Sequence, residues 1–118
     1  MWEDIKAFHE KFGLTYDGEP RDLPKDLASF RLGFILEELD ELIVAENKTD
    51  QLDALVDLVY VVMGTAYLQG FDFKTAWDRV HSANMQKIRG ASKRSESYDI
   101  IKPEGWTAPD LRDLAGEA

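Results

Sequence analysis

Residues 37–41 read EELDE and residues 53–57 read DALVD, and these two acidic stretches decide how the chain is expected to fold. In a helix of about 3.6 residues per turn, Glu37 and Glu41 lie within about 40° of each other, and Glu38 lies within about 60° of Glu41. Asp53 and Asp57 share a helical face in the same way. Like charges at this spacing destabilise an isolated helix by roughly 0.2–0.5 kcal/mol per pair, so water or a hard divalent cation must compensate.

The second acidic stretch opens a strongly apolar segment, residues 52–68, which read LDALVDLVYVVMGTAYL. Because apolar residues surround most of its circumference, we expect a buried helix. An ionised Asp57 in such a helix needs a cation, hydrogen-bond donors or a raised pKa, so it is either a metal ligand or a satisfied structural aspartate. Glu38 lies about 40° from Leu42, at the edge of an apolar stripe, whereas Asp40 points to another side and is expected in water.

The composition indicates one globular domain spanning residues 1–118, with 44% hydrophobic residues. The net charge of −9 argues against binding to a nucleic acid polymer. The chain has no cysteine, which excludes disulfides and thiolate metal sites and favours a reducing cytoplasm. Residues 54–71 are apolar enough to raise the question of a membrane span, but Asp57, Gly64, Thr65 and Gln69 interrupt them, so no membrane is expected.

The pattern of apolar and turn residues predicts four helices, over residues 2–13, 24–46, 50–70 and 72–90. Asp50 is the expected N-cap of the third helix, and residues 47–49 form a connection so short that the second and third helices must be antiparallel neighbours. Residues 91–118 are expected to form an irregular tail. In the second helix the expected buried stripe consists of Leu32, Ile35, Leu36, Leu39, Leu42 and Ile43, and in the fourth helix the buried side includes Trp77.

Four or five carboxylate oxygens that converge from two antiparallel helices suit Mg²⁺ or Mn²⁺, because both ions prefer hard oxygen ligands. A zinc site is not expected, since the chain has two histidines and no thiolate. A di-iron carboxylate bundle would bring two Glu-x-x-His units, and this chain offers only Asp78-x-x-His81. His9 is expected to be a packing or surface residue, and Gly64 is expected to allow close helix packing.

Both acidic motifs together resemble the two-helix signature of the all-α nucleotide pyrophosphohydrolases. This superfamily includes MazG-like enzymes, dimeric dUTPases and phosphoribosyl-ATP pyrophosphohydrolases. The later run Val80-His81-x-x-Asn84-Met85-x-Lys87, followed by Gly90 and by KPEGW at residues 102–106, is similar to the MazG-like and phosphoribosyl-ATP branch. The resemblance covers roughly residues 28–110, so it implies an all-α, MazG-like helical bundle.

This resemblance implies Mg²⁺-dependent hydrolysis of a nucleoside triphosphate between its α- and β-phosphates, which yields the monophosphate and pyrophosphate. It also implies that Glu38, Glu41 and Asp57 bind the metal ion, and that Glu37 helps to bind it or positions the attacking water. The family commonly has a glutamate three residues before the aspartate, where this chain has Ala54. Asp53 lies on the same face as Asp57 and could substitute as a ligand.

Asn84 and Lys87 match family positions that hold the sugar or the phosphates. By position alone, Lys87 could equally be a last-turn lysine that satisfies helix carbonyls. The polar stretch 91–99 leads to Lys102 and Trp106 and could fold over bound nucleotide as a lid. Tyr60 lies on the helical stripe of Asp53 and Asp57. The candidate substrate contacts are therefore Asn84, Lys87, Lys102 and Tyr60.

Two other functions stay open at this point. One is a phosphoribosyl-ATP pyrophosphohydrolase, or a close paralogue that acts on another nucleotide. The other is a non-catalytic helical module that senses a nucleotide or a metal ion. In each case a monomer would leave residues 54–68 poorly covered, so we expect a homodimer or a dimer of dimers with this helix at the interface.

Overall fold

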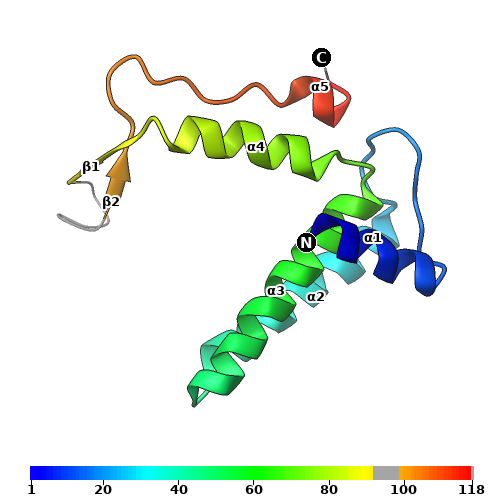
Figure 1. Ribbon diagram of the computed structural model, residues 1–118. Helices are drawn as coiled ribbons and strands as arrows, with labels where there is room; N and C mark the ends of the chain where they lie inside the picture. Colours follow the sequence, from blue (N-terminus) through cyan, green and yellow to red (C-terminus); the bar gives the residue numbers. More distant parts are fainter. Residues whose placement is uncertain (92–98, 118) are drawn as a thin grey trace. The chain divides into compact units, whose positions relative to one another are not determined.

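The computed structural model describes residues 1–91 and 99–117, and it confirms the predicted all-α class. Two compact units divide the chain, Met1–Phe73 and Lys74–Ala118. The helices are α1 (Trp2–Lys11), α2 (Lys25–Val44), α3 (Lys48–Leu68), α4 (Phe73–Asn84) and the short α5 (Arg112–Ala115), and one small sheet pairs β1 (Ile88–Gly90) with β2 (Asp99–Ile101) (Figure 1).

In the first unit, α2 and α3 form an antiparallel hairpin, with α1 packed against α3. The predicted N-cap is wrong by three residues. Asn47 takes that position, and its side-chain oxygen accepts a hydrogen bond of 2.8 Å from the Asp50 backbone N–H. Asparagine caps a helix as well as aspartate does, so α3 begins at Lys48, directly after Asn47. The connection between α2 and α3 is consequently only residues 45–47.

Gly70 ends α3, as predicted, in a left-handed backbone conformation with φ of 74°. A Cβ atom at this position would lie 2.8 Å from the Tyr16 ring and 2.9 Å from the Gly18 carbonyl oxygen. Glycine is therefore required both by the backbone conformation and by the close approach of the loop between α1 and α2. The Arg21 side chain fastens the same loop by donating a 3.0 Å hydrogen bond to the Leu68 carbonyl.

The core of the first unit is small and centres on α3. Its buried apolar residues are Ile5, Ala54, Val61, Met63, Ala66 and Leu68. The predicted buried stripe of α2 is wrong for four of its members, because Leu32, Leu36, Leu39 and Ile43 are exposed. Within one chain, α2 is covered by α3 along one side only, so an apolar pattern on the other side finds no neighbour.

In the second unit, α4 ends at Asn84, six residues before the predicted stop at Gly90. The residues expected to continue the helix instead pair as β1 with β2, in the antiparallel register that places Ile88 opposite Ile101. The Trp106 indole N–H donates a 2.7 Å hydrogen bond to the Ala83 carbonyl in the last turn of α4. The tail thus contains a strand and a short helix, and Trp77, predicted to be buried, is exposed.

Candidate metal centre

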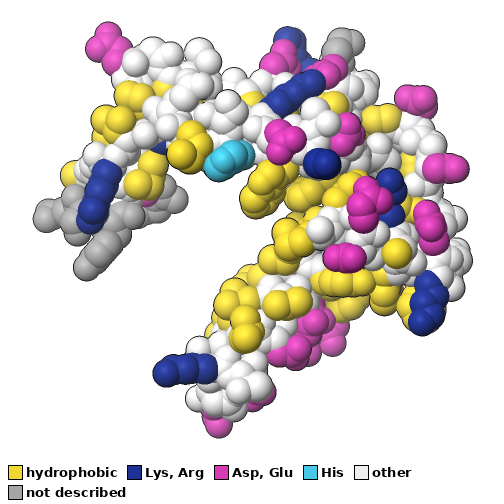
Figure 2. All heavy atoms as spheres, viewed as in Figure 1, with side chains coloured by type: hydrophobic (Ala, Val, Ile, Leu, Met, Phe, Trp, Pro, Cys, Tyr) yellow, Lys and Arg dark blue, Asp and Glu magenta, His cyan; other side chains and the backbone are white. Residues whose placement is uncertain are grey.

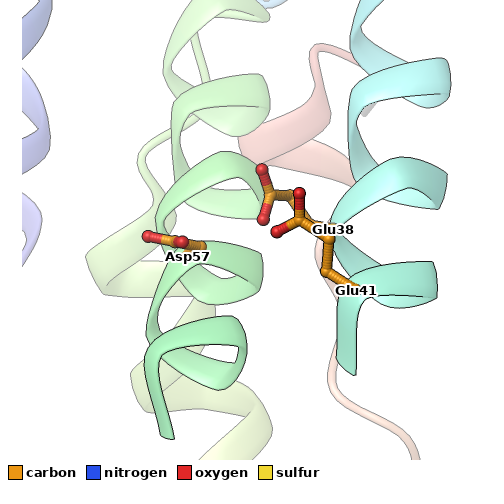
Figure 3. Close-up of side chains that lie close together, drawn as sticks. All are labelled: Glu38, Glu41 and Asp57. Carbon is orange, nitrogen blue, oxygen red and sulfur yellow. The ribbon is translucent and has the colours of Figure 1, made fainter. Parts of the chain in front are cut away.

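Three carboxylates converge in the α2–α3 hairpin. Glu38 and Glu41 project from α2 toward α3, where Asp57 lies, and one oxygen from each side chain falls within 4.8 Å of the other two (Figure 3). The short connection 45–47 explains this convergence, because it places the last turns of α2 beside the first turns of α3. The structure therefore brings together the three ligands that the family resemblance implies.

The three side chains differ in their access to solvent. Glu38 is 9% exposed, Asp57 is half-buried and Glu41 is exposed. Among the described residues, Glu38 Oε2 is the one buried side-chain oxygen that lacks a hydrogen-bond partner. Buried acceptors are normally paired, so this oxygen marks a position where a donor or a cation is needed.

Burial raises the pKa of the Glu38 carboxyl above its ordinary value. The negative charges of Glu41, Asp57 and Glu37 raise this pKa further, because each disfavours a second carboxylate nearby. A cation bound among these groups would reverse both effects, since it favours the ionised form of every ligand.

The donor set fits a hard divalent cation. All three ligands are carboxylate oxygens, and they come from two helices whose backbones are held by their own hydrogen bonds. Mg²⁺ and Mn²⁺ prefer such ligands, and a site with one open side leaves room for water and for substrate oxygens. The residues present thus fit the predicted type of metal site.

The two other predicted acidic residues lie next to this cluster. Glu37 is exposed on α2 and acts on the cluster through its charge. Asp53 is exposed on α3 and lies outside the group of three oxygens. It lines, with Glu41 and Asp50, a hollow of ≈ 420 Å³ at the connection between the two helices. The roles of Glu37 and Asp53 stay predictions.

The predicted substrate contacts are distributed over both units. Tyr60 is half-buried on α3, with its ring edge-on to Phe8 of α1 at a centroid distance of 5.2 Å. Asn84 is exposed as the last residue of α4. The ammonium groups of Lys87 and Lys102 each lie 5.1 Å from the centre of the Trp106 ring.

Residues 92–98, which make up most of the predicted lid, lie outside the described residues.

One buried polar residue was missed by sequence reasoning. Arg31 is 8% exposed on α2 and donates hydrogen bonds to Val61 and Thr65 of α3. The available signal was a positive charge inside the apolar run FRLGFIL at residues 30–36. Gly64 permits close packing, as predicted, and His9 is buried against Tyr67, which agrees with a packing role.

An all-α fold with a carboxylate cluster between two antiparallel helices agrees with the MazG-like pyrophosphohydrolases that the sequence resembles. The family model for phosphoribosyl-ATP pyrophosphohydrolase matches residues 5–84, which include most of α1 and all of α2, α3 and α4. The chain belongs to this family, whose members are typically metal-dependent, and it is accordingly an enzyme of the nucleotide pyrophosphohydrolase class. A search of curated proteins finds no match.

The raised pKa of Glu38 predicts a pH dependence of stability in metal-free protein. The folded chain keeps a proton at a pH where the unfolded chain has lost it, so this stabilisation is complete below the ordinary glutamate pKa. It is lost as the pH rises through the raised pKa of the folded chain. In chelator, the melting temperature should therefore fall as the pH rises above the ordinary glutamate pKa, and Glu38→Gln should remove this part of the slope.

Asp40→Asn is the matched control, because Asp40 is an exposed acid on the same helix. Identical pH profiles for wild type and Glu38→Gln would show that the Glu38 carboxyl does not titrate abnormally.

Proposed function

We propose that this protein hydrolyses a nucleoside triphosphate or deoxynucleoside triphosphate between its α- and β-phosphates, in a reaction that requires Mg²⁺ or Mn²⁺. The observation that carries the proposal is the convergence of Glu38, Glu41 and Asp57 in a chain of a pyrophosphohydrolase family. Such carboxylate clusters are what phosphoryl chemistry needs, because the reaction depends on a positioned metal ion and water more than on a protein nucleophile.

Glu38, Glu41 and Asp57 would hold the cation, with Asp53 as a possible further ligand from the same face of α3. A cation held by these residues would supply neutralisation of the charge that develops on the phosphate oxygens. Glu37, exposed beside this cluster, would orient the attacking water and accept its proton. The oxygen of this water forms the new bond to phosphorus, the anhydride bond breaks, and pyrophosphate leaves.

Phosphoribosyl-ATP is a second candidate substrate, favoured by the description of the matching family. It is itself a substituted nucleoside triphosphate, so the same metal centre and the same bond cleavage would serve both candidates. The two candidate substrates differ in the room that the site must leave around the base.

The absence of cysteine still favours a cytoplasmic enzyme.

The decisive test measures pyrophosphate release from a panel of ribonucleotides, deoxyribonucleotides and phosphoribosyl-ATP with Mg²⁺, with Mn²⁺ and with chelator. Wild type should release pyrophosphate only with metal, and Asp57→Asn should lower kcat/KM by about 100-fold or more because a ligand charge is lost. The metal-free Asp57→Asn protein should be as stable as wild type or more so, since one repulsive charge is gone.

Asp26→Asn, an exposed acid in the first turn of α2, should keep wild-type activity. Wild type that binds nucleotide but releases no pyrophosphate would favour the non-catalytic module.

The second unit supports a role for Lys87 and Lys102 in binding phosphate. Both ammonium groups lie against one tryptophan ring, and within the described residues neither is within 4.0 Å of a carboxylate oxygen. Their charges are thus not neutralised by a neighbouring described acid. We propose that both lysines contact the phosphate chain and that Asn84 contacts the sugar or a phosphate.

Lys87→Ala and Lys102→Ala should each lower kcat/KM by about tenfold or more, which corresponds to a loss of about 1.4 kcal/mol of transition-state stabilisation. Lys74→Ala is the control, because Lys74 is an exposed lysine of the same unit. Wild-type kinetics in either variant would remove that lysine from the site.

The exposed apolar residues of the hairpin support a homodimer. On α2 they are Leu32, Leu36, Leu39 and Ile43, and on α3 they are Leu52, Leu55, Val59 and Val62. Both rows advance by alternating steps of three and four residues, the spacing with which helices pack in coiled coils and bundles. Figure 2 shows hydrophobic side chains exposed along this hairpin. We propose that a second copy of the chain covers the two rows, and that pairs of dimers can associate further.

Light scattering at micromolar concentration should show a dimer or a tetramer, and Leu36→Lys or Val59→Lys should shift it toward monomer. Asp40→Lys is the matched control, since it places the same side chain at an exposed polar position of α2. A stable wild-type monomer would contradict the proposal. By length and composition α3 could also cross a membrane, so flotation of the protein with lipid vesicles would identify a bilayer as the cover instead.

A further inference from the structure

Arg31 and Glu38 occupy one face of α2, two turns apart, and both are buried. Among the described residues, the buried polar side chains are these two and His9 of α1. Glu38 belongs to the metal centre, whereas Arg31 has no part in the chemistry proposed above. Burying an arginine costs desolvation free energy, which its contacts must offset.

The guanidinium of Arg31 joins α2 to α3 through two hydrogen bonds. Its Nε donates to Thr65 Oγ1 at 3.1 Å, and its Nη2 donates to the Val61 carbonyl oxygen at 2.8 Å. The Thr65 hydroxyl donates to the same carbonyl at 2.9 Å, which closes the group. Across residues 25–68, all of which the structure describes, these are the side-chain hydrogen bonds between the two helices.

Arg31 lies on the same face of α2 as Glu38, and Gly64 lies on the same face of α3 as Asp57. Arg31 precedes Glu38 by seven residues on α2, and Gly64 follows Asp57 by seven residues on α3. In an antiparallel pair these two positions share one register, about 10 Å along the helix axes from the carboxylates. A Cβ atom on Gly64 would lie 2.7 Å from Arg31 Nη2 and 2.9 Å from His9 Nε2, so glycine makes the close approach possible.

His9 of α1 lies beside the same glycine. Its Nδ1 is 2.8 Å from the Leu14 carbonyl oxygen, and its ring lies 4.6 Å from the Tyr67 ring, centroid to centroid. Burial lowers the pKa of His9, and the charge of Arg31 lowers it as well, which is consistent with a neutral imidazole beside the guanidinium. His9 therefore packs on α3 beside Gly64 without adding a second charge near Arg31.

The partners of Arg31 are all neutral, and burial lowers its pKa. An apolar residue would avoid this desolvation cost and would often give a more stable protein. What a directional buried contact adds is specificity, as when one polar residue fixes the register of a coiled coil. Such specificity is needed here, because apolar residues surround most of α3, which could therefore pack against the apolar stripe of α2 in several alignments.

We propose that Arg31 is a positioning residue that fixes the register of α2 against α3, so that Glu38 and Glu41 stay opposite Asp57 in the metal-free protein. The inference rests on the proposed function in one respect, namely that these carboxylates hold a metal ion. Arg31 itself touches neither substrate nor metal. Its effect on catalysis passes through the affinity for the cation.

The test compares Arg31→Met, Arg31→Lys and Gly64→Ala by Mn²⁺ titration and by thermal melting. Arg31→Met should keep the melting temperature of metal-free protein or raise it, yet its Mn²⁺ dissociation constant should rise tenfold or more. Arg31→Lys should lie between wild type and Arg31→Met, because one ammonium can replace one of the two hydrogen bonds. Gly64→Ala should weaken Mn²⁺ binding although Arg31 is retained, since the new methyl group displaces the guanidinium.

Kinetics separate positioning from a direct role. With saturating metal, kcat of Arg31→Met should return close to that of wild type, because every ligand is still present. Ile5→Val is the control for destabilisation, since Ile5 is buried in α1 and the carboxylates belong to α2 and α3. It should lower the melting temperature without changing Mn²⁺ affinity. Wild-type Mn²⁺ affinity in folded Arg31→Met would overturn the inference, and if that variant does not fold, wild-type affinity in both Arg31→Lys and Gly64→Ala would overturn it.

A metal-free measurement distinguishes this inference from the proposed function. Because the chain has no cysteine, spin labels can be attached at Ser29→Cys on α2 and Gln51→Cys on α3, in labelled protein diluted with unlabelled chain. Arg31→Met should broaden or shift the distance distribution, and one helical turn corresponds to about 5.4 Å. An unchanged distribution would overturn the positioning role. Wild type that binds no Mn²⁺ would instead overturn the proposed metal-dependent reaction.

Discussion

Three carboxylates whose oxygens lie within 4.8 Å of one another must be kept together before any cation neutralises them. Their repulsion acts to separate α2 from α3, and the structure opposes it on both sides of the cluster. On one side the connection of residues 45–47 ties the helices together covalently. On the other side Arg31 reaches across to α3 at the position where Gly64 leaves room for it. The candidate metal centre thus lies between two fixed points, and it includes Glu38 Oε2, which is buried without a hydrogen-bond partner.

The same two helices also explain why the first unit has so small a core. Each helix must present one face to its neighbour in the hairpin, carry acids on an adjoining face, and place apolar residues on what remains. With 73 residues, the unit cannot cover all of those apolar residues itself. The proposed dimer would cover them, and it would also press the hairpin together from outside. Assembly and metal binding are then linked, because both favour the same alignment of α2 and α3.

The sequence predicts well those features that depend on local spacing. Helical periodicity places Glu38 and Glu41 on one face, and the short connection brings Asp57 to them, as the structure confirms. Features that depend on distant parts of the chain were predicted wrongly or missed. Gly90 looks like a helix stop, but pairing with residues 99–101 ends the helix at Asn84. The apolar pattern around Leu36 predicts burial but does not reveal whether another part of the same chain covers this residue, and in one chain it is exposed. The sequence also does not reveal that the Arg31 side chain reaches the Val61 carbonyl oxygen, because the two residues are far apart along the chain.

Charge is divided unevenly along the chain, and this division bears on how an anionic substrate could approach. Residues 1–73 carry sixteen acids and six lysines or arginines, whereas residues 74–118 carry seven acids and eight lysines or arginines. A triphosphate is repelled by the first unit for as long as its carboxylates have no cation. If the proposed reaction is correct, the nucleotide must therefore arrive with its metal ion or after the metal ion. The order of binding then follows from electrostatics, because the cation is what turns a repulsive cluster into a site for phosphate.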